Sequence, residues 1–207
     1  MLVVGLTGGI ATGKSTVARM LQERGAAVLD ADALVHELQA PGTEVFRAIL
    51  DAFGPEILTA DGRLDRGKLG ARVFAEPEAR RILEGIVHPA LTAQIVRRVD
   101  ALRQGGRTLL CVLEAALLVE GGRRGIVDRL VVITAPEEQQ VARLRAKGGL
   151  SEQEAWRRVR AQLPSALKAR HADDVLVNDG DLASLARQVA DLADALLREG
   201  AGEEKTP

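Results

Sequence analysis

Five short apolar segments recur along the chain, and each is bounded by turn-forming or charged residues. Each segment is continuously hydrophobic rather than alternating, which is typical of strands buried on both faces of a parallel sheet. The pattern predicts strands at Leu2–Leu6, Ala27–Asp30, Thr108–Glu114, Arg129–Thr134 and Asp174–Asn178.

Segments with helical spacing of apolar residues lie between these runs. They predict helices at Ser15–Arg24, with Gly25 as a C-cap, at Pro136–Lys147, with the proline in the first turn, and at Leu182–Arg198. Strands that alternate with helices indicate a doubly wound α/β fold.

Two stretches interrupt the alternation. Glu37–Gln104 is helical in pattern, free of strands and too long for an ordinary crossover, so it predicts an insertion that covers a second substrate. Within it, Pro89 predicts a bend and an extended His88, whose spacing alone indicates no role. Arg143–Arg170 is rich in arginine and allows two interpretations, a mobile lid over phosphates or a solvated helical face.

Composition narrows the class of protein. The 207 residues carry 28 Lys and Arg against 29 Asp and Glu, so there is no basic excess to favour a nucleic-acid partner. The single cysteine, Cys111, lies inside an apolar run and is expected to be buried. No apolar run approaches the roughly 20 residues that span a bilayer, no leader pattern opens the chain, and we expect a cytoplasmic protein. Aromatic residues are only 2%, so arginine and aliphatic side chains are expected to sandwich any adenine.

The clearest motif is Gly8-Gly9-Ile10-Ala11-Thr12-Gly13-Lys14-Ser15, which fits the P-loop pattern at every fixed position. A predicted strand precedes it and a predicted helix follows. Glycines let backbone N–H groups converge on phosphate oxygens, and the helix N-terminus adds unpaired donors. We expect Lys14 to neutralise the β- and γ-phosphates of a nucleoside triphosphate and the Ser15 hydroxyl to coordinate Mg²⁺.

Carboxylates close two of the predicted strands. In open parallel sheets ligands bind outside the carboxyl ends of the strands, so Asp30 and Asp32 are expected near the P-loop. Asp32 is either a proton acceptor or metal-site carboxylate, or the N-cap of the following helix. Glu114 ends its strand where a Walker B carboxylate stands, and Glu120 is either near the same cleft or an ordinary surface glutamate.

Assembled in order, these residues resemble the dephospho-CoA kinase family. The resemblance covers nearly the whole chain and includes Thr7, Thr16, Asp30-Ala31-Asp32, Leu64-Asp65-Arg66, His88-Pro89, Leu117-Leu118-Val119-Glu120, Arg143-Leu144, Gln162, Ala172-Asp173 and Asn178. It implies a P-loop kinase with a five-stranded parallel sheet flanked by helices, which transfers the ATP γ-phosphoryl group to the ribose 3′-hydroxyl of dephospho-CoA.

The resemblance also implies a domain plan and roles for residues. Residues 1–36, 105–136 and 171–207 would form the nucleotide-binding core, 37–104 the coenzyme A-binding domain and 137–170 the lid. Asp32 would be the general base, with Lys14 as the second catalytic residue. ATP would contact Gly8, Gly9, Ala11, Thr12, Gly13, Lys14, Ser15, Thr16 and Arg143. The acceptor would contact Thr7, Asp32, His88, Leu117 and Glu120, and Ser15 would hold Mg²⁺ with Glu114 acting through water. We expect no nucleic-acid or membrane partner, and a monomer or small homo-oligomer.

The chain departs from the family pattern at four places. Ala11 replaces a glycine, Glu114 an aspartate, Ala116 a proline, and Lys147-Gly148 an Arg-Asp pair. A substitution of lysine for arginine keeps the charge but loses the bidentate fork. Two alternatives remain open at this point, another small-molecule kinase that acts on a nucleoside, shikimate or gluconate, and a nucleotide-dependent switch without catalysis.

Overall fold

The computed structural model describes residues 1–116 and 123–202, which form two compact units. The first unit comprises Met1–Leu29 and Ala101–Pro207, and the second comprises Asp30–Asp100. The functional division into core, coenzyme A-binding domain and lid stays a prediction.

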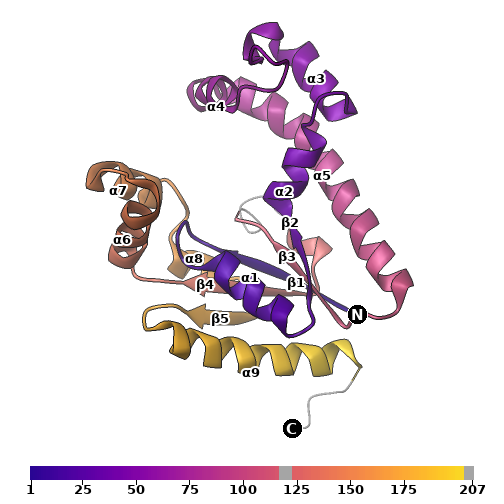
Figure 1. Cartoon of the computed structure of the whole chain (residues 1–207), viewed down its shortest axis with the longest axis vertical. Coiled ribbons are helices and arrows are strands. Elements are labelled where there is room, and N and C mark those ends of the chain that lie inside the picture. Colours follow the sequence, from indigo (N-terminus) through magenta and orange to yellow (C-terminus); the bar gives the residue numbers. More distant parts are fainter. Residues whose placement is uncertain (117–122, 203–207) are drawn as a thin grey trace. The chain divides into compact units, whose positions relative to one another are not determined.

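A five-stranded parallel sheet forms the centre of the first unit (Figure 1). Its strands follow the order β2-β3-β1-β4-β5. Their bounds are β1 Leu2–Gly8, β2 Ala27–Asp30, β3 Leu110–Glu114, β4 Arg129–Thr134 and β5 Asp174–Val177. All five predicted strands and the predicted α/β fold are therefore confirmed. β1 runs two residues further than its apolar pattern, because Thr7 and Gly8 pair with Val132 and Ile133 of β4.

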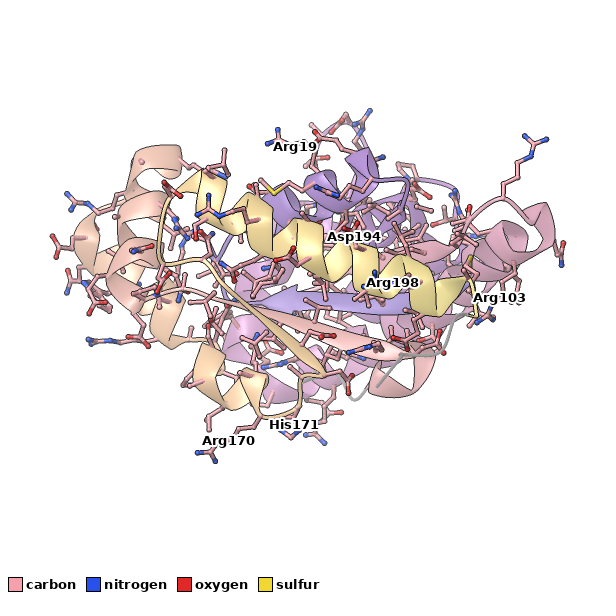
Figure 2. All side chains as sticks on the ribbon, turned by 90° about the horizontal axis from the view of Figure 1, so that it is seen from below. Arg19, Arg103, Arg170, His171, Asp194 and Arg198 are labelled. Carbon is pink, nitrogen blue, oxygen red and sulfur yellow. The ribbon has the colours of Figure 1, made fainter. Side chains whose placement is uncertain are left out.

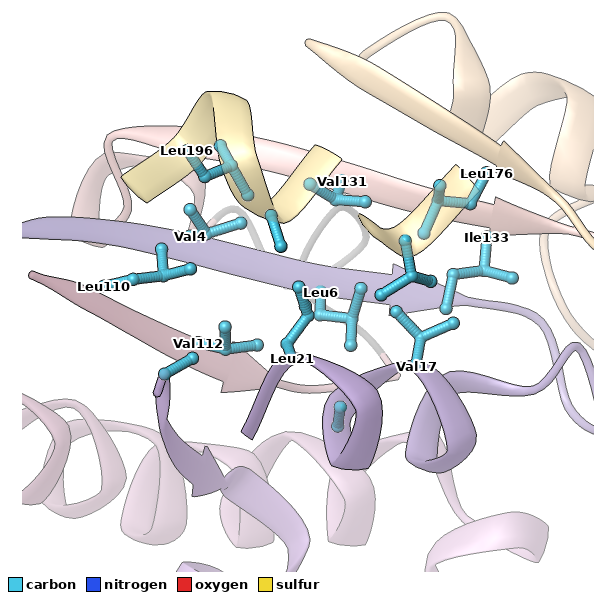
Figure 3. Close-up of a cluster of buried hydrophobic side chains, with 14 of the residues drawn as sticks. Val4, Leu6, Val17, Leu21, Leu110, Val112, Val131, Ile133, Leu176 and Leu196 are labelled. Carbon is cyan, nitrogen blue, oxygen red and sulfur yellow. The ribbon is translucent and has the colours of Figure 1, made fainter. Parts of the chain in front are cut away.

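Helices α1 (Lys14–Glu23) and α9 (Leu182–Gly200) pack against one face of this sheet. The buried cluster joins Val4 and Leu6 of β1 to Val17 and Leu21 of α1 and to Leu196 of α9 (Figure 3). α9 keeps the exposed Asp194 and Arg198 on its solvent side (Figure 2). Both helices were predicted from the spacing of their apolar residues. The C-cap of α1 is Arg24 rather than Gly25, and Gly25 follows it with a positive φ of 94°.

The other helices of the first unit lie between β3 and β5 along the chain. They are the 3₁₀ helix η2 Arg123–Ile126, α6 Glu137–Gly148, α7 Glu152–Arg160 and α8 Ser165–Ala169. Pro136 is the N-cap of α6 rather than a residue of its first turn. α6 and α7 pack on each other through Val141, Ala155 and Val159, and α8 lies against β4.

The second unit is helical, as predicted. It contains α2 Ala31–Leu38, α3 Glu44–Phe53, the 3₁₀ helix η1 Pro55–Ile57, α4 Arg66–Ala75 and the start of α5 Pro77–Gly105. Its core includes Ile49, Phe53, Ile57 and Leu69. An isolated antiparallel bridge between Leu58 and Leu64 closes a turn.

The extended backbone predicted for His88 is wrong, because α5 continues through His88 and Pro89 as one helix of 29 residues. An internal proline removes one backbone hydrogen bond and crowds the carbonyl four residues earlier. Buried Val87 and Leu91 on either side favour the continuous helix, and the crowded carbonyl belongs to Gly85, which has no side chain to add to the clash. Packing thus outweighs the local preference of the residue before proline.

Cys111 is fully buried in β3, as predicted, and burial raises the pKa of its thiol to about 11. Burial therefore favours the neutral thiol in the folded protein. The contribution of this thiol to the free energy of unfolding is fully present below the pKa that the thiol has in the unfolded chain, and it is lost as the pH rises towards 11. In the part of the chain that the structure describes, no helix is long and apolar enough to cross a membrane.

Candidate active site

The P-loop lies at the point where the strand order reverses. β1 is central, with β3 on one side and β4 on the other, and the loop leaves its carboxyl end. This is the position at which open α/β sheets bind ligands. The loop leads directly into α1, whose N-cap is Gly13 and whose first turn has no side-chain cap. The N-terminal amides of α1 and the positive end of its dipole therefore suit an anion.

Two glycines of the loop are required by its geometry. A Cβ on Gly8 would stand 2.6 Å from the carbonyl oxygen of Ile133, so any side chain there would push the loop away from β4. Gly13 has a φ of 104°, and a Cβ on it would meet the Asn178 amide at 2.5 Å. The loop's shape therefore depends on both positions.

Lys14 lies across the start of the loop. Its Nζ donates to the carbonyl oxygens of Gly8 at 3.0 Å and Gly9 at 3.1 Å. Thr12 closes the same turn from inside, since its fully buried hydroxyl donates to the Gly9 carbonyl at 2.9 Å. The ammonium is thus held at the phosphate-binding loop by backbone oxygens that a triphosphate can replace.

Ser15 and Glu114 come together at the carboxyl ends of β1 and β3. The Ser15 hydroxyl donates to the Glu114 carboxylate, with 2.9 Å between Oγ and Oε1. The register of the sheet places Glu114 beside Leu6 of β1, and the Ala115 amide donates to the Leu6 carbonyl at 3.0 Å. A hydroxyl beside a carboxylate is an oxygen-rich pair that suits Mg²⁺.

Arg143 of α6 clamps one wall of the loop. Its guanidinium donates to the carbonyl of Ala11 at 3.3 Å, to the Gln139 side chain at 3.0 Å, and to both the carbonyl and the side-chain oxygen of Asn178 at 3.1 and 3.2 Å. Asn178, directly after β5, donates in turn to the Thr12 carbonyl at 2.7 Å. These contacts fix the loop to α6 and to the residue that follows β5.

A cavity of about 270 Å³ opens beside this clamp. One group of its lining residues comes from the P-loop and α1, and the other from α6, the segment after β5, and α9. They are Ala11, Gly13, Thr16, Arg143, Lys147, Asn178, Gly180, Leu182 and Leu185. A guanidinium and two leucines thus face a cavity next to the phosphate loop, which is the kind of lining predicted for an adenine in a chain poor in aromatic residues.

Ala11 adopts a left-handed backbone with a φ of 57°, and it is the position where the family pattern has glycine. Among the described residues it is the one residue other than glycine with a positive φ. This conformation costs an L-residue with a Cβ roughly 1–2 kcal/mol. Ala11 is therefore held against its own preference by the contacts around the loop.

We expect Ala11→Gly to raise the free energy of unfolding by about 1 kcal/mol, because glycine removes the left-handed penalty and loses part of that gain through a more flexible unfolded chain. Chemical denaturation followed by circular dichroism measures the change. Ala71→Gly, at an exposed position inside α4, is the matched control and should lose about 1 kcal/mol. An equal loss in both variants would contradict the prediction.

Four other arginines of the predicted lid make contacts within their own segment. Arg145 contacts Glu152 at 3.4 Å, Arg158 contacts Glu154 at 3.2 Å, and Arg157 also pairs with Glu154. Arg160 lies over the Trp156 ring with 4.7 Å to its centroid. Exposed pairs of this kind are the property of a solvated helical face. The contact of Arg143 with Ala11, in contrast, reaches the P-loop. Closure of the segment over ATP stays a prediction.

Thr7 is fully buried, and its hydroxyl donates to the carbonyl of Ala116 at 3.1 Å. It supports the backbone after β3, and a direct contact with the acceptor stays a prediction. Two further residues predicted to bind the acceptor, Leu117 and Glu120, lie outside the described residues.

The structure decides which of the two aspartates caps α2, and the role of Asp32 as a proton acceptor stays a prediction. Asp30 is the N-cap of α2, and its carboxylate accepts from the amides of Asp32 at 2.8 Å and Ala33 at 3.1 Å. The alternative interpretation of Asp32 as the N-cap is therefore wrong, because the cap falls two residues earlier. Asp32 lies exposed in the first turn. His88 is half-buried within α5, and its role stays a prediction.

Three residues of this region carried no predicted role. Asn178 carries the link between the loop and β5, Gln162 accepts from the Ile10 amide at 2.7 Å, and Lys168 is fully buried in α8. Asn178 and Gln162 belong to the family pattern, which was the available signal. Nothing in the local pattern around Lys168 sets it apart from an exposed lysine of a helix.

Comparisons with known proteins point to a kinase family. The sequence model of the family described as dephospho-CoA kinase matches residues 2–184. Relatives named dephospho-CoA kinase include one from Symbiobacterium thermophilum, 51% identical over 91% of this chain and 79% of its own length, and one from Methylococcus capsulatus, 49% identical over 91% and 93%.

Solved structures extend the comparison to the fold. A Thermus thermophilus protein is 35% identical with a TM-score of 0.80 and covers 94% of this chain and 97% of its own. Dephospho-CoA kinase from Campylobacter jejuni is 25% identical with a TM-score of 0.71 and covers 98% of both chains. Shikimate kinase from Acinetobacter baumannii, 18% identical with a TM-score of 0.52 over 100% and 96%, shares the fold alone. Given a P-loop at the switch point of the sheet and a family match that runs from β1 into α9, the chain belongs to the dephospho-CoA kinase family.

Proposed function

We propose that the protein transfers the γ-phosphoryl group of ATP to the ribose 3′-hydroxyl of dephospho-CoA. The observation that carries this proposal is the family match over residues 2–184, which spans both the P-loop unit and the helical unit. A match to the P-loop alone would support only triphosphate binding.

On the donor side, the amides of the loop and of the first turn of α1 hold the β- and γ-phosphates, and Lys14 neutralises their charge. The nucleoside lies in the cavity beside Arg143, between its guanidinium and the leucines of α9. The contacts of Arg143 to Ala11 and Asn178 support this assignment, because they hold the guanidinium rigidly before ATP arrives. Rigid positioning of this kind lowers the entropy lost on binding.

The metal side consists of Ser15 and Glu114. Bound Mg²⁺ supplies neutralisation of the charge on the β- and γ-phosphate oxygens. The described residues contain no group of three His, Cys, Asp or Glu side chains that could hold a metal by themselves. A site with few protein ligands fits Mg²⁺, which is usually held by one or two protein oxygens together with water and substrate phosphates. Ser15 would bind it directly and Glu114 through water.

On the acceptor side, Asp32 accepts the proton of the 3′-hydroxyl while the hydroxyl oxygen forms its bond to the γ-phosphorus and ADP leaves. The exposed position of Asp32 and the capping of α2 by Asp30 support this role, since the Asp32 carboxylate is not used to cap the helix. Such proton transfer typically contributes 10²- to 10⁴-fold to a rate.

The helical unit holds a cavity of about 500 Å³ that suits an anionic part of the acceptor. Two arginines and a histidine line it, together with uncharged residues: His36, Gln39, Ala40, Pro41, Arg63, Leu64 and Arg66. The Arg66 guanidinium donates to His36 Nε2, so the imidazole orients the arginine. We assign the diphosphate of dephospho-CoA to this cavity, because guanidinium forks match phosphate oxygens.

We expect Arg66→Gln to raise the KM for dephospho-CoA about tenfold, which corresponds to one charge-assisted hydrogen bond. The KM for ATP should not change. Arg81→Gln, an exposed arginine of the same unit that pairs with Glu78, is the matched control. Steady-state kinetics with both substrates varied measures the effect. Adenosine as a truncated acceptor lacks the diphosphate, so its turnover should be equal in the variant and the wild type. A penalty of the same size with adenosine would sink the assignment.

The test of the function is an acceptor assay. The protein is incubated with Mg·ATP and, in separate reactions, with dephospho-CoA, adenosine, shikimate and gluconate, and the products are identified by mass spectrometry. We expect a product one phosphoryl group heavier with dephospho-CoA, at a kcat/KM far above that of the other acceptors. Preference for shikimate or gluconate, or ATP binding without any phosphorylated product, would contradict the proposal.

A further inference from the structure

We infer that Lys168 is a positioning residue for the metal side of the site. Its ammonium fixes the backbone just after β3 and so holds the Glu114 carboxylate beside Ser15. The inference rests on the proposed function only in taking Mg·ATP as the ligand.

Lys168 is buried in a place where a lysine is costly. Its exposed fraction is 0%, whereas Arg170 and His171, which follow α8, are exposed and point away from the ribbon (Figure 2). Transfer of an ammonium from water into a protein interior is strongly unfavourable unless hydrogen-bond acceptors compensate for it. A methionine would fill a similar volume without that cost. The buried charge therefore has to be explained by what it contacts.

One contact of Lys168 is with a carbonyl that already has a donor. Lys168 Nζ donates to the Ala116 carbonyl oxygen at 3.1 Å, and the buried Thr7 hydroxyl donates to the same oxygen at 3.1 Å. A carbonyl oxygen has two lone pairs, and here both are used. The donors come from two different elements, α8 and β1, so the carbonyl is fixed from two directions.

That carbonyl belongs to the segment that carries the metal-side carboxylate. Hydrogen bonds hold each of three consecutive residues, which begin with Glu114 at the end of β3. The Glu114 carboxylate accepts from Ser15 at 2.9 Å, the Ala115 amide donates to Leu6 at 3.0 Å, and the Ala116 carbonyl accepts from Thr7 and Lys168. Glu114 is a longer side chain than the aspartate of the family pattern. Its carboxylate therefore depends more on a fixed backbone to remain at Ser15.

α8 is well placed to give this support. It lies against β4, and it follows α7 after the segment in which Gln162 accepts from the Ile10 amide of the P-loop at 2.7 Å. Lys168 thus joins α8, which follows the α6–α7 segment, to the backbone two residues after Glu114. Partners that orient the groups of a metal site typically contribute 10- to 100-fold to metal affinity.

The test compares ATP binding with and without Mg²⁺ by isothermal titration calorimetry, on the full chain. The measured quantity is the ratio of the two dissociation constants, with EDTA in the metal-free arm. We expect Lys168→Met to reduce the gain from Mg²⁺ about tenfold. The affinity for metal-free ATP should stay that of the wild type. Arg170→Met removes the same charge two residues away at an exposed position, and should keep the full gain.

Two more variants separate positioning from a role in stability alone. Lys168→Arg keeps a donor and should recover part of the gain from Mg²⁺. Thr7→Val removes the other donor to the same carbonyl without touching the buried charge, so it should also reduce the gain. Because both side chains act through one carbonyl, the effects of Thr7→Val and Lys168→Met should combine to less than their sum.

A folded Lys168→Met protein that melts earlier but keeps the full gain from Mg²⁺ would overturn the inference. If that variant does not fold, a folded Thr7→Val protein with an unchanged gain overturns it in the same way. The measurement needs no acceptor. Failure of the wild type to phosphorylate dephospho-CoA would therefore count against the proposed function and leave this inference standing.

Discussion

Replacement of Lys14 by alanine should lower kcat for phosphoryl transfer by about 10²- to 10³-fold, the usual cost of one lost electrostatic contact to the charge of a transition state. Lys14 supplies a full positive charge at the phosphate loop, and the loop carbonyls of Gly8 and Gly9 hold it there. The loop glycines and Thr12 retain their own contacts in the variant, so the loss is confined to the ammonium.

Kinetics at saturating dephospho-CoA and ATP measure the effect. Thermal unfolding of Lys14→Ala serves as the control for an intact fold. Lys14→Arg is a second control, because it restores the charge but not the compact shape of an ammonium, and it should recover only part of the rate. Turnover of Lys14→Ala within a few-fold of the wild type would show that the P-loop does not hold the transferred phosphate.

Replacement of Asp32 by asparagine should lower kcat about 10²- to 10⁴-fold, the contribution typical of a general base. Asparagine is nearly isosteric and cannot accept the proton of the 3′-hydroxyl. The KM values for both substrates should change little, because the loss falls on the transition state rather than on binding.

Asp30→Asn is the matched control for that variant. It removes a carboxylate two residues away, and asparagine caps a helix about as well as aspartate, so α2 should keep its N-cap. We expect folding and turnover close to the wild type. A similar loss in both variants would indicate that the acidity of the whole Asp30–Asp32 turn matters rather than a single proton acceptor.

Apolar patterning was sufficient to predict the sheet, because strands buried on both faces leave an unbroken hydrophobic signal in the sequence. The ends of strands were less predictable. Thr7 and Gly8 extend β1 because β4 offers them backbone hydrogen-bonding partners. Neither threonine nor glycine predicts such an extension from sequence. The error at His88-Pro89 has the same origin, since the packing of Val87 and Leu91 is absent from the local rule for proline.

At the site, residues that belong to one contiguous motif could be located from the sequence more readily than residues brought in from a distant part of the chain. The P-loop pattern located Lys14 and Ser15 at the phosphate loop, and their roles stay predictions. The sequence allows Asp32 as an N-cap, and the start of α2 shows that the cap is Asp30 instead. Lys168 looks like any helical lysine until the chain brings it to Ala116, 52 residues away along the sequence.

The burial of Cys111 has a practical consequence. A thiol that is fully buried and whose pKa is raised to about 11 exposes almost no thiolate to solvent near neutral pH. Because it is the single cysteine of the chain, a surface cysteine introduced by mutagenesis would be the one reactive thiol of the native protein. Maleimide dyes or spin labels can then be attached one to each unit, at positions such as Arg81 and Arg170, with the native sequence of β3 left in place. Distance measurements between such labels would follow the two units as ATP and dephospho-CoA bind.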